Sequence, residues 1–130
     1  MRATFRKHER LIGRDRLKAV VTEGLSVHEA PIRLTGLVMP LEPITPAQVA
    51  FAIPKRHVRL ATDRNRIRRQ MREAYRLNKE RWYTALREAD KQCAWLFVYQ
   101  SSRSIGWAGM QEKITRSVDR WIEKHVRAHQ

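Results

Sequence analysis

The sequence predicts a single α+β domain with the order helix, three strands, helix, strand, helix. Two patterns predict it. Apolar residues recur at helical spacing in three stretches, and β-prone residues form short alternating or continuous apolar runs between them. The chain has 130 residues, of which 42% are hydrophobic, so it can bury a modest core without a disulfide or a metal. It has a single cysteine, Cys93, which rules out an intramolecular disulfide.

The first predicted element is a helix over residues 14–23. Leu17, Val20 and Val21 share one face of this helix. Gly24 follows as a natural stop, because glycine is strongly favoured just past the end of a helix.

Three strands are predicted next, over residues 26–30, 32–39 and 48–53. The third alternates large apolar side chains with small or polar ones, which is typical of a strand with one buried face. Residues 40–47 are expected to join the second and third strands as a wide hairpin, and Pro54 to end the third strand.

A long helix is predicted from a cap at Thr62 or Asp63 to about Leu86, with a possible break near Asn78. Its buried stripe is expected to consist of four residues at helical spacing: Ile67, Met71, Ala74 and Tyr75.

The last two predicted elements are a strand over residues 94–99 and a helix over residues 108–127. The strand is a continuous apolar run, as expected for a central strand buried on both faces. The helix would turn Ile114, Val118, Trp121 and Ile122 inward. All four tryptophans are expected in the core: Trp82, Trp95, Trp107 and Trp121.

The chain is strongly basic. Lys and Arg number 27 against 13 Asp and Glu, a net charge of +14. Positive charges in such excess repel one another unless a polyanion neutralises them, and this predicts a nucleic-acid partner. A merely solvated basic surface is the plainer alternative. A membrane partner is not expected, because no exposed apolar face accompanies the charge and prolines interrupt the segment 34–54 at positions 40, 43 and 46.

The charge is concentrated between residues 55 and 81, which hold eleven basic and three acidic side chains. On the helix, arginines recur every four residues beside the apolar stripe. Arginine suits phosphate because its planar fork donates two parallel hydrogen bonds and can stack on a base. The candidate RNA-binding residues are Lys55, Arg56, Arg59, Arg64, Asn65, Arg66, Arg68, Arg69, Arg72 and Arg76.

The segment Asp63-Arg64-Asn65-Arg66-Ile67-Arg68-Arg69 carries a family resemblance. It follows Ile53-Pro54-Lys55-Arg56 and precedes Arg72-Glu73-Ala74-Tyr75-Arg76, and together these resemble the signature of the ribonuclease P protein family. The N-terminal Phe5-Arg6-Lys7-His8-Glu9-Arg10-Leu11 is similar to that family as well.

The resemblance implies a fold like domain two of ribosomal protein S5, with a left-handed crossover between the third and fourth strands, contrary to the general rule. It also implies that Arg64, Asn65, Arg66, Arg68 and Arg69 grip a catalytic RNA, one protein per RNA. A cleft between the first helix and the sheet would hold the 5′ leader of precursor tRNA.

The candidates to line this cleft are Phe5, Leu17, Val21 and Phe51. Leu17 and Val21 stand where the family often has aromatic residues, and the family's usual glycine is missing from residues 55–62. Base stacking in the cleft is therefore expected to be weak.

The function implied is that of a cytoplasmic, non-catalytic subunit that assists removal of the leader. No cofactor is expected on the protein itself, and Mg²⁺ is expected through the RNA. Two alternatives remain: a ribosome-associated structural RNA-binding protein, and a stand-alone nuclease. The second would need its acid–base groups brought together, and the histidines, at positions 8, 28, 57, 125 and 129, are scattered along the sequence.

Overall fold

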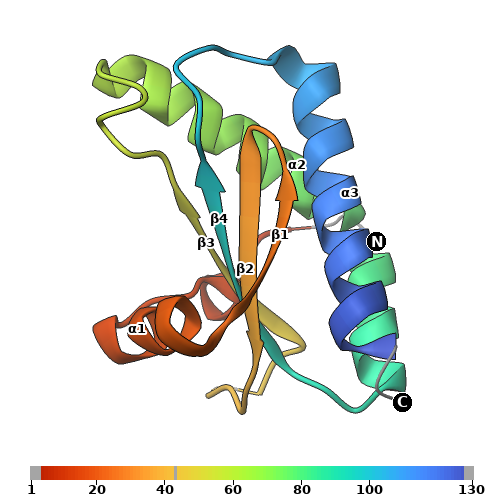
Figure 1. Ribbon diagram of the computed structural model, residues 1–130. Helices are drawn as coiled ribbons and strands as arrows, with labels where there is room; N and C mark the ends of the chain where they lie inside the picture. Colours follow the sequence, from red (N-terminus) through yellow and green to blue (C-terminus); the bar gives the residue numbers. More distant parts are fainter. Residues whose placement is uncertain (1–3, 43, 128–130) are drawn as a thin grey trace.

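The computed structural model describes residues 4–42 and 44–127, and shows one four-stranded sheet with helices on both faces (Figure 1). A short 3-10 turn, Lys7–Glu9, precedes the first helix. The other elements, in chain order, are α1 (Arg14–Glu23), β1 (Leu25–Glu29), β2 (Ile32–Val38), β3 (Ala47–Ala52), α2 (Ala61–Glu88), β4 (Cys93–Tyr99) and α3 (Gly106–His125). The predicted order of elements is confirmed.

The strand order in the sheet is β1-β2-β4-β3. β1 and β4 both pair antiparallel with β2, whereas β3 pairs parallel with β4. The expected hairpin between the second and third strands is therefore wrong, because β4 lies between them. β4 has the most continuous apolar sequence of the four strands, and the centre of the sheet is where such a strand is covered on both faces.

The connection from β3 through α2 to β4 is left-handed. In Figure 1 both strands rise, β4 lies to the right of β3, and α2 passes behind the sheet, which is the opposite of the usual crossover. The crossover implied by the family resemblance is therefore present.

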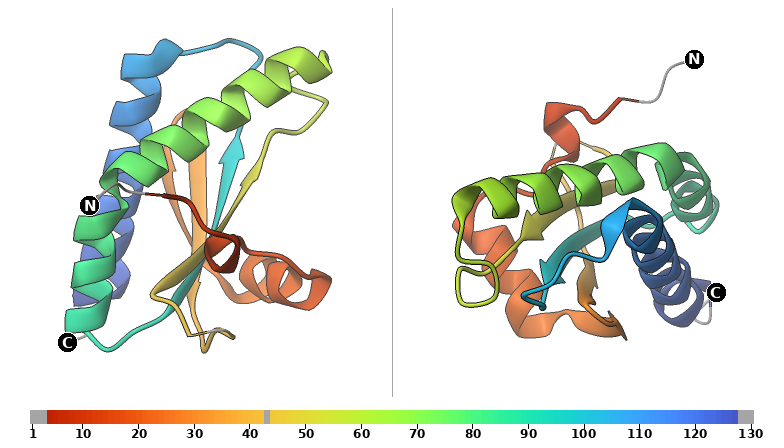
Figure 2. Two further views of the ribbon diagram at one scale, coloured as in Figure 1. Left: turned by 180° about the vertical axis from the view of Figure 1, so that it is seen from behind. Right: turned by 90° about the horizontal axis from the view of Figure 1, so that it is seen from above.

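The helices divide unequally between the two faces of the sheet. α2 and α3 cover one face, and α1 crosses the lower part of the other (Figures 1 and 2). The larger core lies under α2 and α3 and contains the predicted stripes of both helices, while a smaller cluster of Leu11, Val20, Leu41 and Ala94 lies under α1. The upper part of the α1 face carries no helix.

α2 is continuous across Asn78, so the possible break there does not occur. The side-chain amide of Asn78 donates to the Ala74 carbonyl at 2.7 Å, within the helix. The helix begins after Leu60, without a side-chain cap, so the expected cap at Thr62 or Asp63 is also wrong. α3 begins and ends two residues earlier than predicted.

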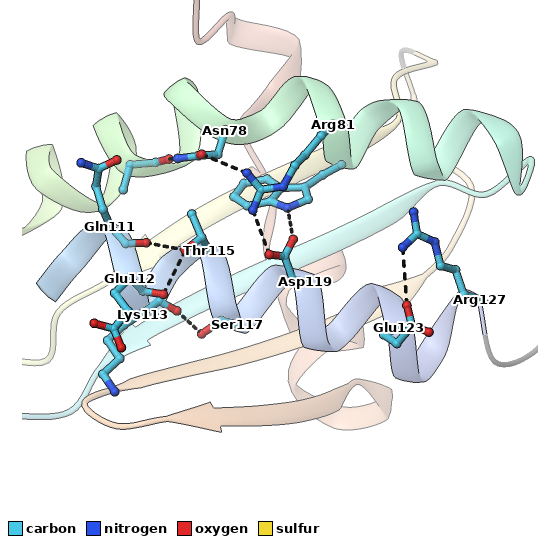
Figure 3. A network of polar contacts seen from close by, with 12 residues as sticks. Asn78, Arg81, Gln111, Glu112, Lys113, Thr115, Ser117, Asp119, Glu123 and Arg127 are labelled. Atoms are coloured by element: carbon cyan, nitrogen blue, oxygen red, sulfur yellow. Dashed lines mark hydrogen bonds and ion pairs between the residues drawn. The ribbon is translucent and has the colours of Figure 1, made fainter. Parts of the chain in front are cut away.

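α2 and α3 are tied together by a polar contact at their surface. The carboxylate of Asp119 on α3 accepts from Arg81 at 2.8 Å and from the Trp82 indole at 2.8 Å (Figure 3). Trp82, Trp95 and Trp121 are buried as predicted. Trp107 is 38% exposed, so its assignment to the core is wrong.

The segment before α1 is fastened to α2 by a buried ion pair. Lys79 donates to Glu9 Oε1 at 2.6 Å and to the Thr4 carbonyl, and Tyr83 donates to the same carboxylate oxygen at 2.9 Å. The backbone N–H of Arg6 donates to Glu9 Oε2 at 2.6 Å. These contacts, together called the Glu9 clamp below, hold the N-terminal segment against the molecule.

Candidate nucleic-acid interface

The first turns of α2 present a hollow lined with arginines. It has a volume of about 450 Å³ and is lined by Thr62, Asn65, Arg68, Arg69 and Arg72. No acidic side chain lines this hollow. Three of the arginines predicted to bind RNA are thereby brought together on one surface, which we call the arginine hollow.

The guanidinium groups in the arginine hollow are largely free to bind an anion. Arg68 donates to the Asn65 side chain at 3.2 Å, and no hydrogen bond or ion pair of Arg69 occurs in the described part of the chain. The Nε of Arg72 is buried and has no partner among the described residues. An unpartnered buried N–H is costly, so Arg72 would gain from a partner that a change of its side-chain rotamer brings within reach.

The other arginines of the motif have partners within the protein. Arg64 donates to the carbonyls of Val58, at 3.0 Å, and Arg59, at 2.7 Å, so it shapes the loop before α2. Arg66 forms an exposed ion pair with Asp63 at 3.3 Å.

Arg76 is paired with Glu73 at 2.5 Å. Its hydrogen bond lowers the pKa of the Glu73 carboxyl, so this acidic group is charged at neutral pH. The arginines of α2 thus divide into those that have partners within the protein, such as Arg64 and Arg76, and those that have none among the described residues, such as Arg69.

The loop between β3 and α2 extends the basic surface. Val58 is buried, and its backbone N–H donates to the Pro54 carbonyl at 3.2 Å, which makes the loop compact. Lys55, Arg56 and Arg59 are exposed on this loop. The structure therefore places these three cations next to the start of α2.

The four residues expected to line a leader cleft do not lie together. Phe51 stacks on Phe97, at 5.4 Å between ring centroids, and packs with Phe5 in the larger core under α2. Leu17 packs in the smaller cluster under α1, and Val21 is 66% exposed. Phe5 and Phe51 are thus on the opposite face of the sheet from Leu17 and Val21 and cannot line the same cleft.

Residues 5–122 match the Ribonuclease P family. The chain belongs to the ribonuclease P protein family. The ribonuclease P protein component of Porphyromonas gingivalis is 28% identical over 114 residues, which is 88% of this chain and 83% of that protein.

Two solved ribonuclease P proteins share the fold. The Thermotoga maritima protein has a TM-score of 0.66 and 18% identity, over 86% of this chain and 96% of that one. The Staphylococcus aureus protein, as a mutant described as having defective mRNA degradation activity, has a TM-score of 0.70 and 16% identity, over 91% and 90%. The family and the α+β fold expected from the sequence are confirmed.

Within this ribonuclease P fold, the α1 side of the sheet presents residues that were not among the candidates from the sequence. On the α1 side of the sheet, Ala52, Val98 and Arg33 are neighbours in register, and the first two are half-buried. The next row contains Ala50, Leu96 and Thr35. The small residues that alternate with large ones in β3 were the signal for this open face.

No group of three or more His, Cys, Asp or Glu side chains that could hold a metal exists among the residues that the structure describes; residue 129, one of the histidines considered above, lies outside them. Nor is any helix in the described ranges long and apolar enough to cross a membrane.

Proposed function

We infer that this chain is the protein subunit of a ribonuclease P and that it binds the catalytic RNA through the arginine hollow and the loop before α2. The observation that carries this is the hollow itself, with three arginines, an amide and a hydroxyl but no carboxylate. Basic side chains that are merely exposed to solvent on a helix normally alternate with acidic side chains that pair with them. This surface lacks them at its centre.

The chemistry of the hollow fits a phosphate backbone. Arginine forks bind phosphate oxygens bidentately, and each phosphate neutralised releases condensed counterions, which favours binding at low salt. The cations of the loop, Lys55, Arg56 and Arg59, lengthen the surface beyond one phosphate. An extended, folded polyanion is therefore a better ligand than a small anion.

The leader of precursor tRNA would lie on the open α1 side of the sheet. Single strands need a surface for their bases as well as cations for their phosphates. Ala52 and Val98 supply a flat apolar floor, and the exposed Arg33 beside them supplies a cation. The central positions of these rows carry no ring, and His28, which pairs with Arg33, lies on the edge strand β1, so we expect contacts that depend little on base identity.

We assign the cleavage chemistry to the RNA subunit, which would bind the Mg²⁺. The protein would bind RNA and screen the charges of its phosphates. Its proposed location is the cytoplasm. One protein per RNA is proposed. Added lysine and arginine can replace part of the diffuse cation screening between two RNAs. The protein should therefore lower the magnesium concentration that the RNA requires.

The decisive experiment is to measure the affinity for the RNA subunit of the same organism in Arg68→Ala and Arg69→Ala. Each loss of a charge-assisted contact should weaken binding by roughly 1–3 kcal/mol and reduce the slope of log K against log salt by about one. Arg87→Ala is the matched control, because it removes an exposed positive charge from the far end of the same helix. Equal affinities in all three variants would contradict the assignment of the hollow.

The two other candidate functions are separated by a cleavage assay. Precursor tRNA is incubated with the protein, with the RNA subunit, and with both, at low magnesium. We expect cleavage only with both. Cleavage by protein freed of RNA would identify a stand-alone nuclease, and the activity named for the Staphylococcus aureus protein makes an mRNA substrate a useful additional arm. No stimulation in any arm would favour a ribosome-associated role.

The leader assignment has its own test. Affinity for precursor tRNA is measured against leader length, with and without the protein. The protein should increase the preference for precursor over mature tRNA over the first few leader nucleotides, with little dependence on their sequence. An equal gain for mature tRNA would contradict binding of the leader on the sheet.

A further inference from the structure

Trp107 is the exposed member of the four tryptophans. It is 38% exposed, whereas Trp82, Trp95 and Trp121 are at most 1% exposed. It belongs to neither apolar cluster of the protein; at this end of α3 the neighbouring Ile105 packs against the larger core instead. Within the described residues, no ring contact or hydrogen bond engages the Trp107 indole.

The indole of Trp107 lines a second hollow together with polar and charged side chains of α2. This second hollow has a volume of about 270 Å³, and its other lining residues are Arg66, Arg69, Gln70 and Glu73. Arg69 also lines the arginine hollow, so the two hollows adjoin at this side chain. The structure thereby connects the start of α3 to the surface proposed to bind RNA.

The charges in this hollow favour an anionic ligand. Glu73 is its one acidic side chain, and that carboxylate is paired with Arg76. Arg66 has only an exposed ion pair with Asp63, which contributes little and can be exchanged for a phosphate. No described partner competes for Arg69.

Trp107 lies in the first turn of α3 between two small residues. Gly106 and Ala108 flank it, and Gly106 has a φ of +72°, in the left-handed region that favours glycine. A side chain larger than hydrogen would be strained at this position. The first turn of α3 also contains no acidic residue that would repel a phosphate.

We propose that Trp107 is a platform on which one unstacked nucleobase of the bound RNA stacks, with its phosphates held by Arg66 and Arg69. This inference rests on the proposed function and extends its surface from α2 to α3. An exposed indole beside two guanidinium groups combines the two contacts that single-stranded nucleotides require, a π-face and a cation. Gln70 can donate to or accept from the edge of the base.

The first test uses tryptophan fluorescence. Because the other three indoles are buried, acrylamide should quench chiefly Trp107 in the free protein. At a saturating concentration of the RNA subunit, the Trp107 emission should be protected from quenching by acrylamide. Trp107 that stays fully quenchable in the saturated complex would overturn the proposal.

The second test compares three variants, Trp107→Phe, Trp107→Leu and, as a control, Leu77→Ala. Leu77 is an exposed apolar residue of α2 that lines neither hollow. If the ring stacks on a base, Leu should weaken RNA binding about five-fold or more, Phe should retain most of the affinity, and Leu77→Ala should have no effect. Circular dichroism confirms that each variant is folded.

The outcomes separate this proposal from the function on which it depends. Equal weakening by Phe and Leu would indicate packing and overturn the platform, as would wild-type affinity in Trp107→Leu. If Arg68→Ala weakens binding while Trp107→Leu does not, the proposed function stands and the platform fails. If the wild-type protein does not bind the RNA subunit, both fail.

Discussion

The Glu9 clamp predicts a large loss of stability when either of its charges is removed. Both side chains are almost fully buried, with 3% exposure for Glu9 and 7% for Lys79. Removing one partner leaves the other as an uncompensated buried charge. We therefore consider Glu9→Gln and Lys79→Met, which keep the approximate size of each side chain.

The expected loss in the free energy of unfolding is about 3 kcal/mol for each variant, the lower end of the range for breaking a buried pair. The lower end applies because part of the hydrogen bonding survives. In Lys79→Met, Glu9 still accepts from the Arg6 N–H and from Tyr83. The double variant should lose less than the two single losses added, since neither charge is then left unpaired.

The clamp also predicts a dependence on pH. Burial raises the pKa of Glu9, but hydrogen bonds from Lys79, the Arg6 N–H and Tyr83 outweigh burial and leave the pKa below its usual 4.5. A carboxyl with a lowered pKa stabilises the folded state above its unfolded pKa and loses this effect as the pH falls through the folded pKa. The stability difference between wild type and Glu9→Gln should therefore be full above about pH 5 and shrink below 4.5.

The assay is urea unfolding followed by circular dichroism, at neutral pH and at several acidic values. Arg81→Met is the control, because Arg81 lies on the same helix as Lys79, whereas its ion pair with Asp119 of α3 is about half exposed on both sides. Exposed pairs typically contribute below 1 kcal/mol. Losses in the clamp variants no larger than in the control, or a difference that does not change with pH, would refute the argument.

Three further predictions follow from single positions. Gly36→Ala should cost roughly 1–3 kcal/mol or more, because a Cβ there would lie 2.5 Å from atoms of both Trp95 and Trp121; a thermal melt equal to wild type would contradict this. Burial raises the pKa of the Cys93 thiol to about 12, so a thiol reagent at neutral pH should modify Cys93 only in denaturant; rapid labelling of the folded protein would be contrary evidence. Arg64→Ala should lower stability as well as RNA affinity, whereas Arg68→Ala should lower affinity alone, because only Arg64 fixes loop carbonyls; equal melts for the two variants would refute this difference.

The sequence by itself determined the elements, the core stripes and the family. Periodicity is a local property, and Ile67, Met71, Ala74 and Tyr75 have to share a helix face whatever lies against it. The crowding of arginines at residues 64–76 is equally local and located the basic face. The resemblance to the family in the sequence rested chiefly on the same motif.

Only the tertiary structure decided which strands are neighbours and which side chains meet. Strand pairing is a choice among non-local partners, so nothing within residues 32–53 shows that β4 inserts between β2 and β3. The same choice placed Phe51 and Leu17 on opposite faces and left Trp107 at the surface beside Arg69. The division of arginines into committed ones, such as Arg64, and free ones also depends on loop carbonyls whose positions the folded chain sets.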